Sequence, residues 1–177
     1  MAVASGPMGI HNALILGLDP GRDKVGFAAS DLSGELWFSG ILPAREFEGW
    51  LVRLRSSECC HAGLFVPQVL EDGNSGEGVP VAVALGNGTC CGELAAALRK
   101  ADLRCRILCV DERGTTLEAR QLYWRLHRPG WWQRLLPSSM RVPPRPLDDL
   151  AAWAIALRGL GVYKNLKLRT GQDGGED

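Results

Sequence analysis

Residues 14–30 read LILGLDPGRDKVGFAAS, and this stretch decides the fold. The apolar run Leu14–Leu18 ends in one carboxylate, Asp19, after which Pro20–Gly21 turns the chain and Val25–Ser30 is apolar again. The pattern predicts a strand, a glycine turn and a second strand. An ionised carboxylate at the end of a buried strand needs a partner, and Mg²⁺ prefers such oxygen ligands. A turn-capping aspartate in an ordinary hairpin is the alternative interpretation.

The composition is that of one globular domain of 177 residues. We expect the domain to span residues 12–162, with tails at 1–11 and 163–177. The formal net charge is zero, which excludes a binder driven by overall positive charge. No run is long enough to span a bilayer and no signal peptide is evident, so we expect no membrane association and a cytoplasmic protein. The six cysteines form no C-x-x-C pair and are predicted to be free thiols.

The first half of the chain predicts an antiparallel meander followed by a helix. A third strand over residues 35–42 follows the two strands above through a short turn. Residues 45–55 place apolar side chains at helical spacing, which predicts an amphipathic helix. Residues 62–70 are compatible with a short strand, and 71–78 form a glycine-rich loop without an assigned role.

The next segments predict a strand–helix–strand–helix order. A strand over 79–85 is followed by Gly86-Asn87-Gly88-Thr89 and a helix over 92–100. A glycine turn before a helix N-terminus favours an anion, and a tight βα turn without a ligand is the alternative. A strand over 104–110 then ends at Asp111-Glu112, so Glu112 follows a strand as Asp19 does. Thr115 and Glu118 fit a capping box that opens a helix reaching residue 126.

The segment 119–147, called the basic segment below, contains six arginines and no acid. Its prolines exclude regular helix over much of residues 127–146. Exposed arginines could bind phosphates, and Trp131 and Trp132 could stack on bases. The alternative is that the two tryptophans fill the core. Asp148-Asp149 then open a last helix over 150–160, with Gly161 predicted to lie just past its end.

This order of elements resembles ribonuclease H-like domains, an α/β class with a mixed five-stranded sheet of three antiparallel strands and then parallel strands, flanked by helices. Three motifs resemble those of the YqgF/RuvX family of RuvC-like nucleases. They are Leu18-Asp-Pro-Gly21 with Lys24-Val-Gly26, Asp111-Glu-Arg-Gly-Thr-Thr-Leu-Glu-Ala119, and Leu147-Asp-Asp-Leu-Ala-Ala152. One departure is Leu85-Gly-Asn-Gly-Thr89, which is more similar to the related domain of Tex-type transcription factors.

The resemblance implies that Asp19, Glu112 and Asp148 are catalytic and bind Mg²⁺ or Mn²⁺, with Asp149 assisting or replacing Asp148 as a ligand. Mutual repulsion would raise the pKa values of such carboxylates until cations bind. Two bound ions would hold the scissile phosphate between attacking water and leaving oxygen. Flanking phosphates would be contacted by a basic set: Lys24, Arg113, Arg120, Arg141 and Arg145.

The resemblance implies a nuclease acting on structured RNA or branched DNA. Processing of the 5′ end of precursor 16S ribosomal RNA is favoured over resolution of a Holliday junction, because junction cutting calls for a symmetric dimer and a monomer or weak homodimer is expected. One competing class is the sugar-kinase and actin ATPases, whose phosphate motif also reads Asp-x-Gly, but they need two such lobes. The other is a non-catalytic, Tex-like nucleic-acid-binding module.

Overall fold

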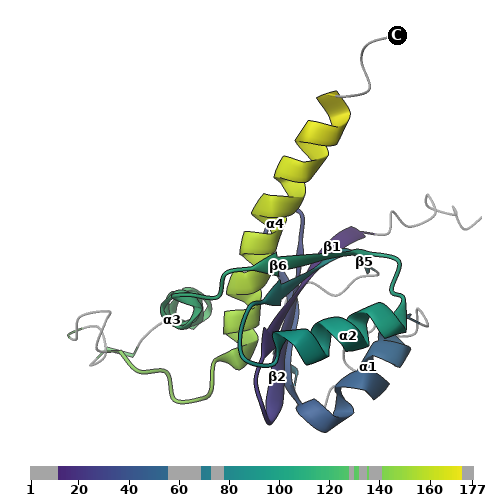
Figure 1. The fold of residues 1–177 in the computed structure, drawn as a ribbon. Coiled ribbons are helices and arrows are strands. Elements are labelled where there is room, and N and C mark those ends of the chain that lie inside the picture. The colour runs from purple at the N-terminus through teal and green to yellow at the C-terminus, as the bar shows by residue number, and fades with distance from the viewer. Residues whose placement is uncertain are drawn as a thin grey trace, which may run out of the picture.

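The computed structural model describes residues 12–55, 69–72, 78–127, 130–131, 135 and 141–172. Six strands form one sheet in the order β4-β3-β2-β1-β5-β6 (Figure 1). The strands are β1 (Asn12–Pro20), β2 (Lys24–Asp31), β3 (Leu36–Pro43), β4 (Val69–Asp72), β5 (Gly78–Gly86) and β6 (Arg106–Val110). The helices are η1 (Ala44–Glu46), α1 (Phe47–Arg55), α2 (Cys91–Ala101), α3 (Thr115–Leu126) and α4 (Asp148–Gln172).

The strand pairing confirms the ribonuclease H-like α/β arrangement. Strands β1, β2 and β3 pair antiparallel as a meander, and β5 and β6 then run parallel to β1. The five predicted strands are all present. The short β4 adds a sixth strand, antiparallel to β3, at the edge of the sheet. It covers Val69–Asp72, so a strand lies where a loop was expected from residue 71, and residues 62–68 of the predicted strand lie outside the described residues.

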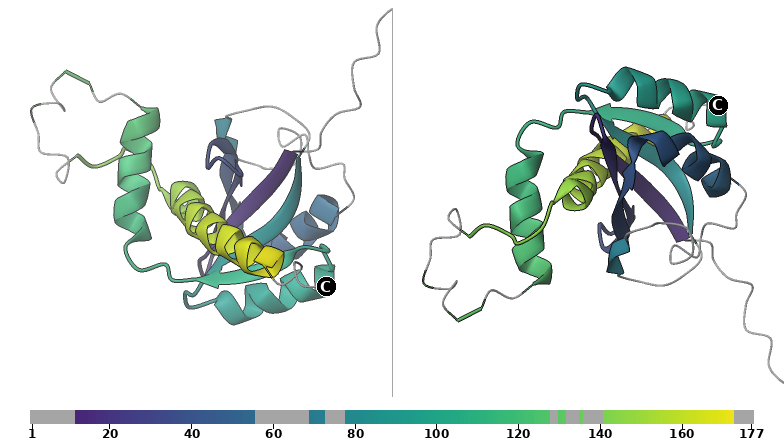
Figure 2. Two further views of the ribbon diagram at one scale, coloured as in Figure 1. Left: turned by 90° about the horizontal axis from the view of Figure 1, so that it is seen from above. Right: turned by 90° about the horizontal axis from the view of Figure 1, so that it is seen from below.

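Helices cover both faces of the sheet because the central strands are apolar on both sides. Alternate β1 residues enter opposite layers: Ile15 joins the cluster under α4, whereas Leu14 and Leu16 join the cluster under α1 and α2. Figure 2 shows α4 on one face and α1 with α2 on the other. Helix α3 packs on α4 and extends away from the sheet. The strand ends are thereby left open at one edge.

Small residues let α4 lie against the sheet backbone. A Cβ on Gly17 of β1 would stand 2.0 Å from the carbonyl oxygen of Ala152, and one on Gly159 of α4 would stand 2.3 Å from the Cβ of Ala84. Neither gap could be opened without moving α4. The close approach fixes the height of the first residues of α4 above β2, where a Cβ on Gly26 would meet the Asp148 carbonyl oxygen at 2.1 Å.

Two expectations about helix ends are wrong. Helix α4 does not end before Gly161 but continues to Gln172. The physical reason is Tyr163, which is buried in the core cluster under α4, where Leu166 also packs. The capping box at α3 does not form: Gly114 is the N-cap, with φ +84°, and no side chain caps the helix. Within the described residues, no helix is long and apolar enough to cross a membrane.

Candidate active site

Three predicted acids lie at one edge of the sheet. Asp19 is the penultimate residue of β1, and Glu112 lies two residues after the end of β6. Because β1, β5 and β6 are parallel, their carboxyl ends meet at this edge. Asp148 arrives from the other direction as the first residue of α4, whose backbone crosses Gly26, the residue paired with Asp19. The order of elements therefore brings together side chains more than 90 and more than 30 residues apart.

The three carboxylates interact through their charges. The pKa of Asp19 is raised from 3.8 to about 6, first by burial and then by repulsion from Glu112 and Asp148, while Lys24 lowers it. The direction agrees with the repulsion expected of converging acids. A group of like charges held together at neutral pH stores unfavourable energy that a bound cation would relieve.

Glu112 sits in a space that two glycines leave open. A Cβ on Gly86 would stand 2.6 Å from Glu112 Oε2, and one on Gly88 would stand 2.5 Å from Oε1. Between them, the side chain of Asn87 accepts a hydrogen bond from the Glu112 backbone N–H at 3.1 Å. The glycine turn thus receives the carboxylate of Glu112 itself, rather than the external anion considered from the sequence. These three turn residues were not predicted as site residues, although their spacing after a strand was visible.

One oxygen of Glu112 lacks a polar partner. Among the described residues, Glu112 Oε2 is buried without a hydrogen bond. A buried carboxylate oxygen in this state is costly and is normally satisfied by a donor, a water or a metal ion. The oxygen is therefore a candidate metal ligand on the evidence of its surroundings.

Arg158 of α4 holds the loop that carries Glu112. Its guanidinium donates to the backbone carbonyl oxygens of Asp111 and of Arg113, the latter at 3.0 Å, and pairs with Glu118 at 2.6 Å. On the other side, the Thr115 hydroxyl donates to the Glu112 carbonyl oxygen at 2.8 Å. Sequence reasoning missed Arg158, because an arginine within a helix carries no signal of its partner loop.

Asp148 and Lys24 form an ion pair across the site. Lys24 Nζ lies 2.7 Å from Asp148 Oδ2, with the side chains 44% and 28% exposed. Lys24 begins β2 and Asp148 begins α4, so the pair joins the β1–β2 turn to the helix. The ammonium group compensates part of the negative charge of the site and remains open to solvent.

Asp149 has a different role from its neighbour. Its carboxylate is fully buried, accepts a hydrogen bond from the Ser39 hydroxyl at 2.9 Å, and pairs with Arg145 at 2.7 and 3.2 Å. Both oxygens are already occupied, so the geometry contradicts the expectation that Asp149 is a metal ligand. It equally removes Arg145 from the predicted phosphate contacts, because that guanidinium also donates to the Pro146 carbonyl oxygen and lies over the ring of Tyr123.

The remaining basic residues and the tryptophans differ in how far the structure describes and exposes them. Arg113 is exposed beside Glu112, and Arg120 and Arg141 are half-buried. Trp131 is 80% exposed and does not fill the core. Trp132 lies outside the described residues.

The donor set fits a hard divalent cation in its chemistry. Three carboxylates converge, and one oxygen is buried without a partner. As placed, no three His, Cys, Asp or Glu side chains in the described part of the chain form a group able to hold a metal ion. A cation bound by all three carboxylates would therefore require their side chains to move closer together.

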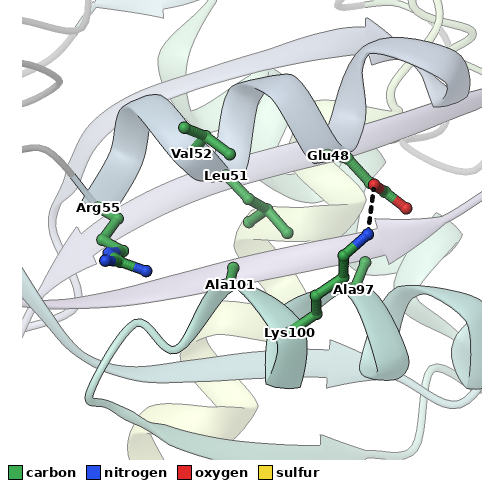
Figure 3. A pocket seen from close by; sticks show the side chains of 7 residues that line it. All are labelled: Glu48, Leu51, Val52, Arg55, Ala97, Lys100 and Ala101. Atoms are coloured by element: carbon green, nitrogen blue, oxygen red, sulfur yellow. Dashed lines mark hydrogen bonds and ion pairs between the residues drawn. The ribbon is translucent and has the colours of Figure 1, made fainter.

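A separate groove of about 490 Å³ lies between α1 and α2, on the face of the sheet opposite α4 (Figure 3). Its floor includes Leu51 and Ala97, and the ion pair of Glu48 with Lys100, at 3.4 Å, lies across it. Its lining includes none of the three converging acids. The groove is thus distinct from the candidate active site.

Comparisons with known proteins find a likeness among solved structures. No family model matches the chain, and no curated protein matches it. A solved structure of T. thermophilus RuvC in complex with a Holliday junction substrate is similar with a TM-score of 0.43 and 18% identity. The alignment covers 86% of this chain and 96% of that one. Strand order and pairing, rather than this likeness, define the fold.

Proposed function

We propose that this protein is a metal-dependent endonuclease that hydrolyses phosphodiester bonds, with Asp19, Glu112 and Asp148 as its catalytic carboxylates. The observation that carries the proposal is their convergence at one sheet edge, where burial and then repulsion from Glu112 and Asp148 raise the pKa of Asp19. The buried, unpartnered oxygen of Glu112 supports it independently. Convergent carboxylates at strand ends suit hydrolysis by activated water.

Bound Mg²⁺ or Mn²⁺ would supply an activated water and stabilise charge on the leaving oxygen. Asp19 and Glu112 would hold the metal from the sheet side, and Asp148 from α4. Asn87 accepts a hydrogen bond from the Glu112 N–H, and Arg158 donates to the carbonyl oxygens of the residues on either side, so both would limit the motion of Glu112. No described residue is required to form a covalent bond with the substrate.

Phosphates flanking the cleavage point would be contacted by a smaller basic set than the one predicted from the sequence: Lys24, Arg113, Arg120 and Arg141. Lys24 already lies beside Asp148, so it would neutralise a phosphate held there. Trp131, which is 80% exposed, offers a flat surface for stacking on an unpaired base. Arg145 is left out because it pairs with Asp149.

For the substrate, we propose structured RNA. The favoured reaction is processing of the 5′ end of precursor 16S ribosomal RNA, and the basis for this choice is proposed membership in the YqgF/RuvX family. This would place the protein in ribosome biogenesis in the cytoplasm, as a monomer or weak homodimer. A Holliday junction is the second candidate substrate. The motif resemblance supports both substrates, and both would be cut by the same hydrolysis of a phosphodiester bond.

The test compares both substrates in one assay. A labelled RNA carrying a precursor 16S 5′ end and a labelled four-way DNA junction are incubated with the protein in Mg²⁺, in Mn²⁺ or in EDTA. We expect metal-dependent endonucleolytic cleavage, and we expect Asp19→Asn and Glu112→Gln each to reduce its rate by at least about 10²-fold, as loss of a group that stabilises the transition state does. The rates on the two substrates assign the natural one.

Asp23→Asn is the matched control. Asp23 lies four residues from Asp19 and is exposed. The Asp23→Asn substitution removes the same charge as Asp19→Asn, but at a position that is not one of the three acids. It should cleave at the parental rate. Binding of both nucleic acids without cleavage in any metal would instead identify a non-catalytic, Tex-like binding module. An Asp19→Asn variant that cuts as fast as the parent would refute the catalytic assignment.

A further inference from the structure

Two cysteines from different elements lie side by side near the candidate active site. Cys91 is the first residue of α2, and Cys109 lies in β6, three residues before Glu112. The Cys91 thiol lies close enough to the Cys109 thiol and to Glu112 to be affected by their charges. Both cysteines are free thiols in the structure. A disulfide requires two thiols on neighbouring backbone segments whose side chains approach each other.

The backbone explains why they meet. Cys109 is the partner of Leu85 in the parallel pairing of β5 with β6. After Leu85 the chain turns back: the Asn87 N–H donates to the Val110 carbonyl oxygen at 3.1 Å, and the Cys91 N–H donates to the Gly88 carbonyl oxygen at 3.1 Å. The turn thus returns the start of α2 to the strand that carries Cys109.

The side chains share one face of the sheet. Cys105 and Ile107 pack against the cluster under α1 and α2, and the two-residue period of a strand places Cys109 on that same face. Cys91 packs against this cluster as well. Cys109 is exposed because β6 is the edge strand of the sheet, whereas Cys91 is half-buried. A small molecule in solvent can therefore reach the pair through Cys109.

We infer that Cys91 and Cys109 are a modification site, a thiol pair that a small-molecule disulfide converts into an intramolecular disulfide. The two oxidised sulfurs would join the N-terminus of α2 to β6. This crosslink would join α2, which follows the turn that receives the Glu112 carboxylate, to β6, which precedes Glu112 in the chain. The inference does not depend on the proposed nuclease activity, because it concerns only the two thiols and their surroundings.

The exchange balances with glutathione disulfide as the oxidant. The Cys109 thiolate attacks one sulfur of glutathione disulfide, whose S–S bond breaks and releases one glutathione thiolate. Cys91 is half-buried whereas Cys109 is exposed, so Cys91 reacts second. It loses its proton to solvent and attacks the Cys109 sulfur, which releases the second glutathione. The protein loses two hydrogens, and one glutathione disulfide becomes two thiols.

The test is a redox titration of the full-length protein. The reduced protein is equilibrated in glutathione buffers of increasing oxidising ratio, remaining thiols are blocked, and intact mass and disulfide-linked peptides are measured. We expect an intramolecular disulfide that dithiothreitol reverses. It should be lost in Cys91→Ser and in Cys109→Ser. It should persist in Cys105→Ser, the matched control, which lies just before the strand that carries Cys109.

A second variant tests whether the other four cysteines take part in the disulfide. The fourfold replacement Cys59→Ser, Cys60→Ser, Cys90→Ser and Cys105→Ser retains only the proposed pair and should still form the crosslink. The inference is overturned by either of two results. One is a mixed disulfide with glutathione at Cys109 without ring closure, and the other is an intramolecular disulfide that survives in Cys91→Ser and so uses another partner.

Discussion

The surroundings of Glu112 show how uncharged residues can shape a charged site. Its carboxylate occupies space that would be filled by a side chain at position 86 or 88. Its orientation is then set through the backbone by Asn87. Carboxylates are readily recognised in a sequence, but the glycines that admit them act only by lacking a Cβ.

Gly88→Ala is predicted to displace Glu112. The added Cβ would stand 2.5 Å from Glu112 Oε1, so the carboxylate must move out of its position. We expect loss of most metal-dependent activity and a smaller increase in melting temperature on adding Mn²⁺, measured by calorimetry. Gly92→Ala is the matched control, because a Cβ at Gly92 meets nothing within 4 Å. If Gly88→Ala retains both the parental rate and the parental Mn²⁺ shift, Glu112 is not held as described.

Asp19→Asn is predicted to stabilise the metal-free protein while removing its response to metal. The folded-state pKa is raised from 3.8 to about 6, so the folded protein binds this proton more tightly than the unfolded chain does. The stability due to protonation is complete below about pH 4 and is lost as the pH rises through 6. The neutral amide avoids that loss, so we expect a gain of about 3 kcal/mol at pH 7.

Chemical denaturation in EDTA between pH 4 and pH 8 measures this difference. The gain of Asp19→Asn over the parent should be absent near pH 4 and should grow up to about pH 7. With Mg²⁺ added at pH 7, only the parent should gain stability. A variant that is less stable than the parent throughout this range would show that Asp19 is stabilised by hydrogen bonds rather than repelled by its neighbours.

At the scale of elements, α4 organises the site. Its first turn supplies Asp148, and Arg158, ten residues later, holds the loop that follows β6. The position of this first turn depends on the buried group formed by Asp149, Ser39 of β3 and Arg145. A charged pair of this kind fixes the register of the helix against the sheet.

Arg145→Ala is predicted to destabilise the protein. It would leave the fully buried Asp149 carboxylate without its cation, which costs about 3–5 kcal/mol in comparable buried pairs. The control is Arg125→Ala, which breaks an exposed pair with Glu35 and should cost no more than about 1 kcal/mol. Thermal and urea denaturation measure both. Equal stabilities of the two variants would contradict the structural role of Arg145.

At the scale of the whole molecule, a neutral chain carries its charge unevenly. The basic segment between residues 119 and 147 contains six arginines and no acid, although the net charge of the chain is zero. Arg113 and Arg120 lie on the side of the protein formed by α3 and the loop that precedes it. A nucleic acid at the sheet edge would therefore meet a locally positive surface.

The double variant Arg113→Ala with Arg120→Ala is predicted to bind nucleic acid more weakly and with less dependence on salt. Loss of two phosphate contacts should reduce the slope of log K against log salt by about 2 on duplex DNA. Binding is measured by fluorescence anisotropy at several salt concentrations in Ca²⁺ or EDTA. Arg55→Ala, on the opposite face of the sheet, should leave the slope unchanged. An unchanged slope in the double variant would place the nucleic acid elsewhere.

The sequence by itself determined the sheet and the place of two acids. Apolar runs with period two, punctuated by glycine turns, identify β1, β2, β3, β5 and β6, because strand and turn preferences are local. An acid directly after a parallel strand must lie at the carboxyl edge of the sheet, so Asp19 and Glu112 were predictable. The start of α3 was predictable as well, although its capping box was not formed.

Only the tertiary structure decided which of two adjacent acids faces the site. Successive residues of a helix point about 100° apart, so Asp148 reaches Lys24 while Asp149 is buried against Ser39 and Arg145. The same holds for α4 beyond Gly161, which stays helical because Tyr163 is buried in the core. These outcomes depend on contacts between segments far apart in the chain, and no local pattern encodes them.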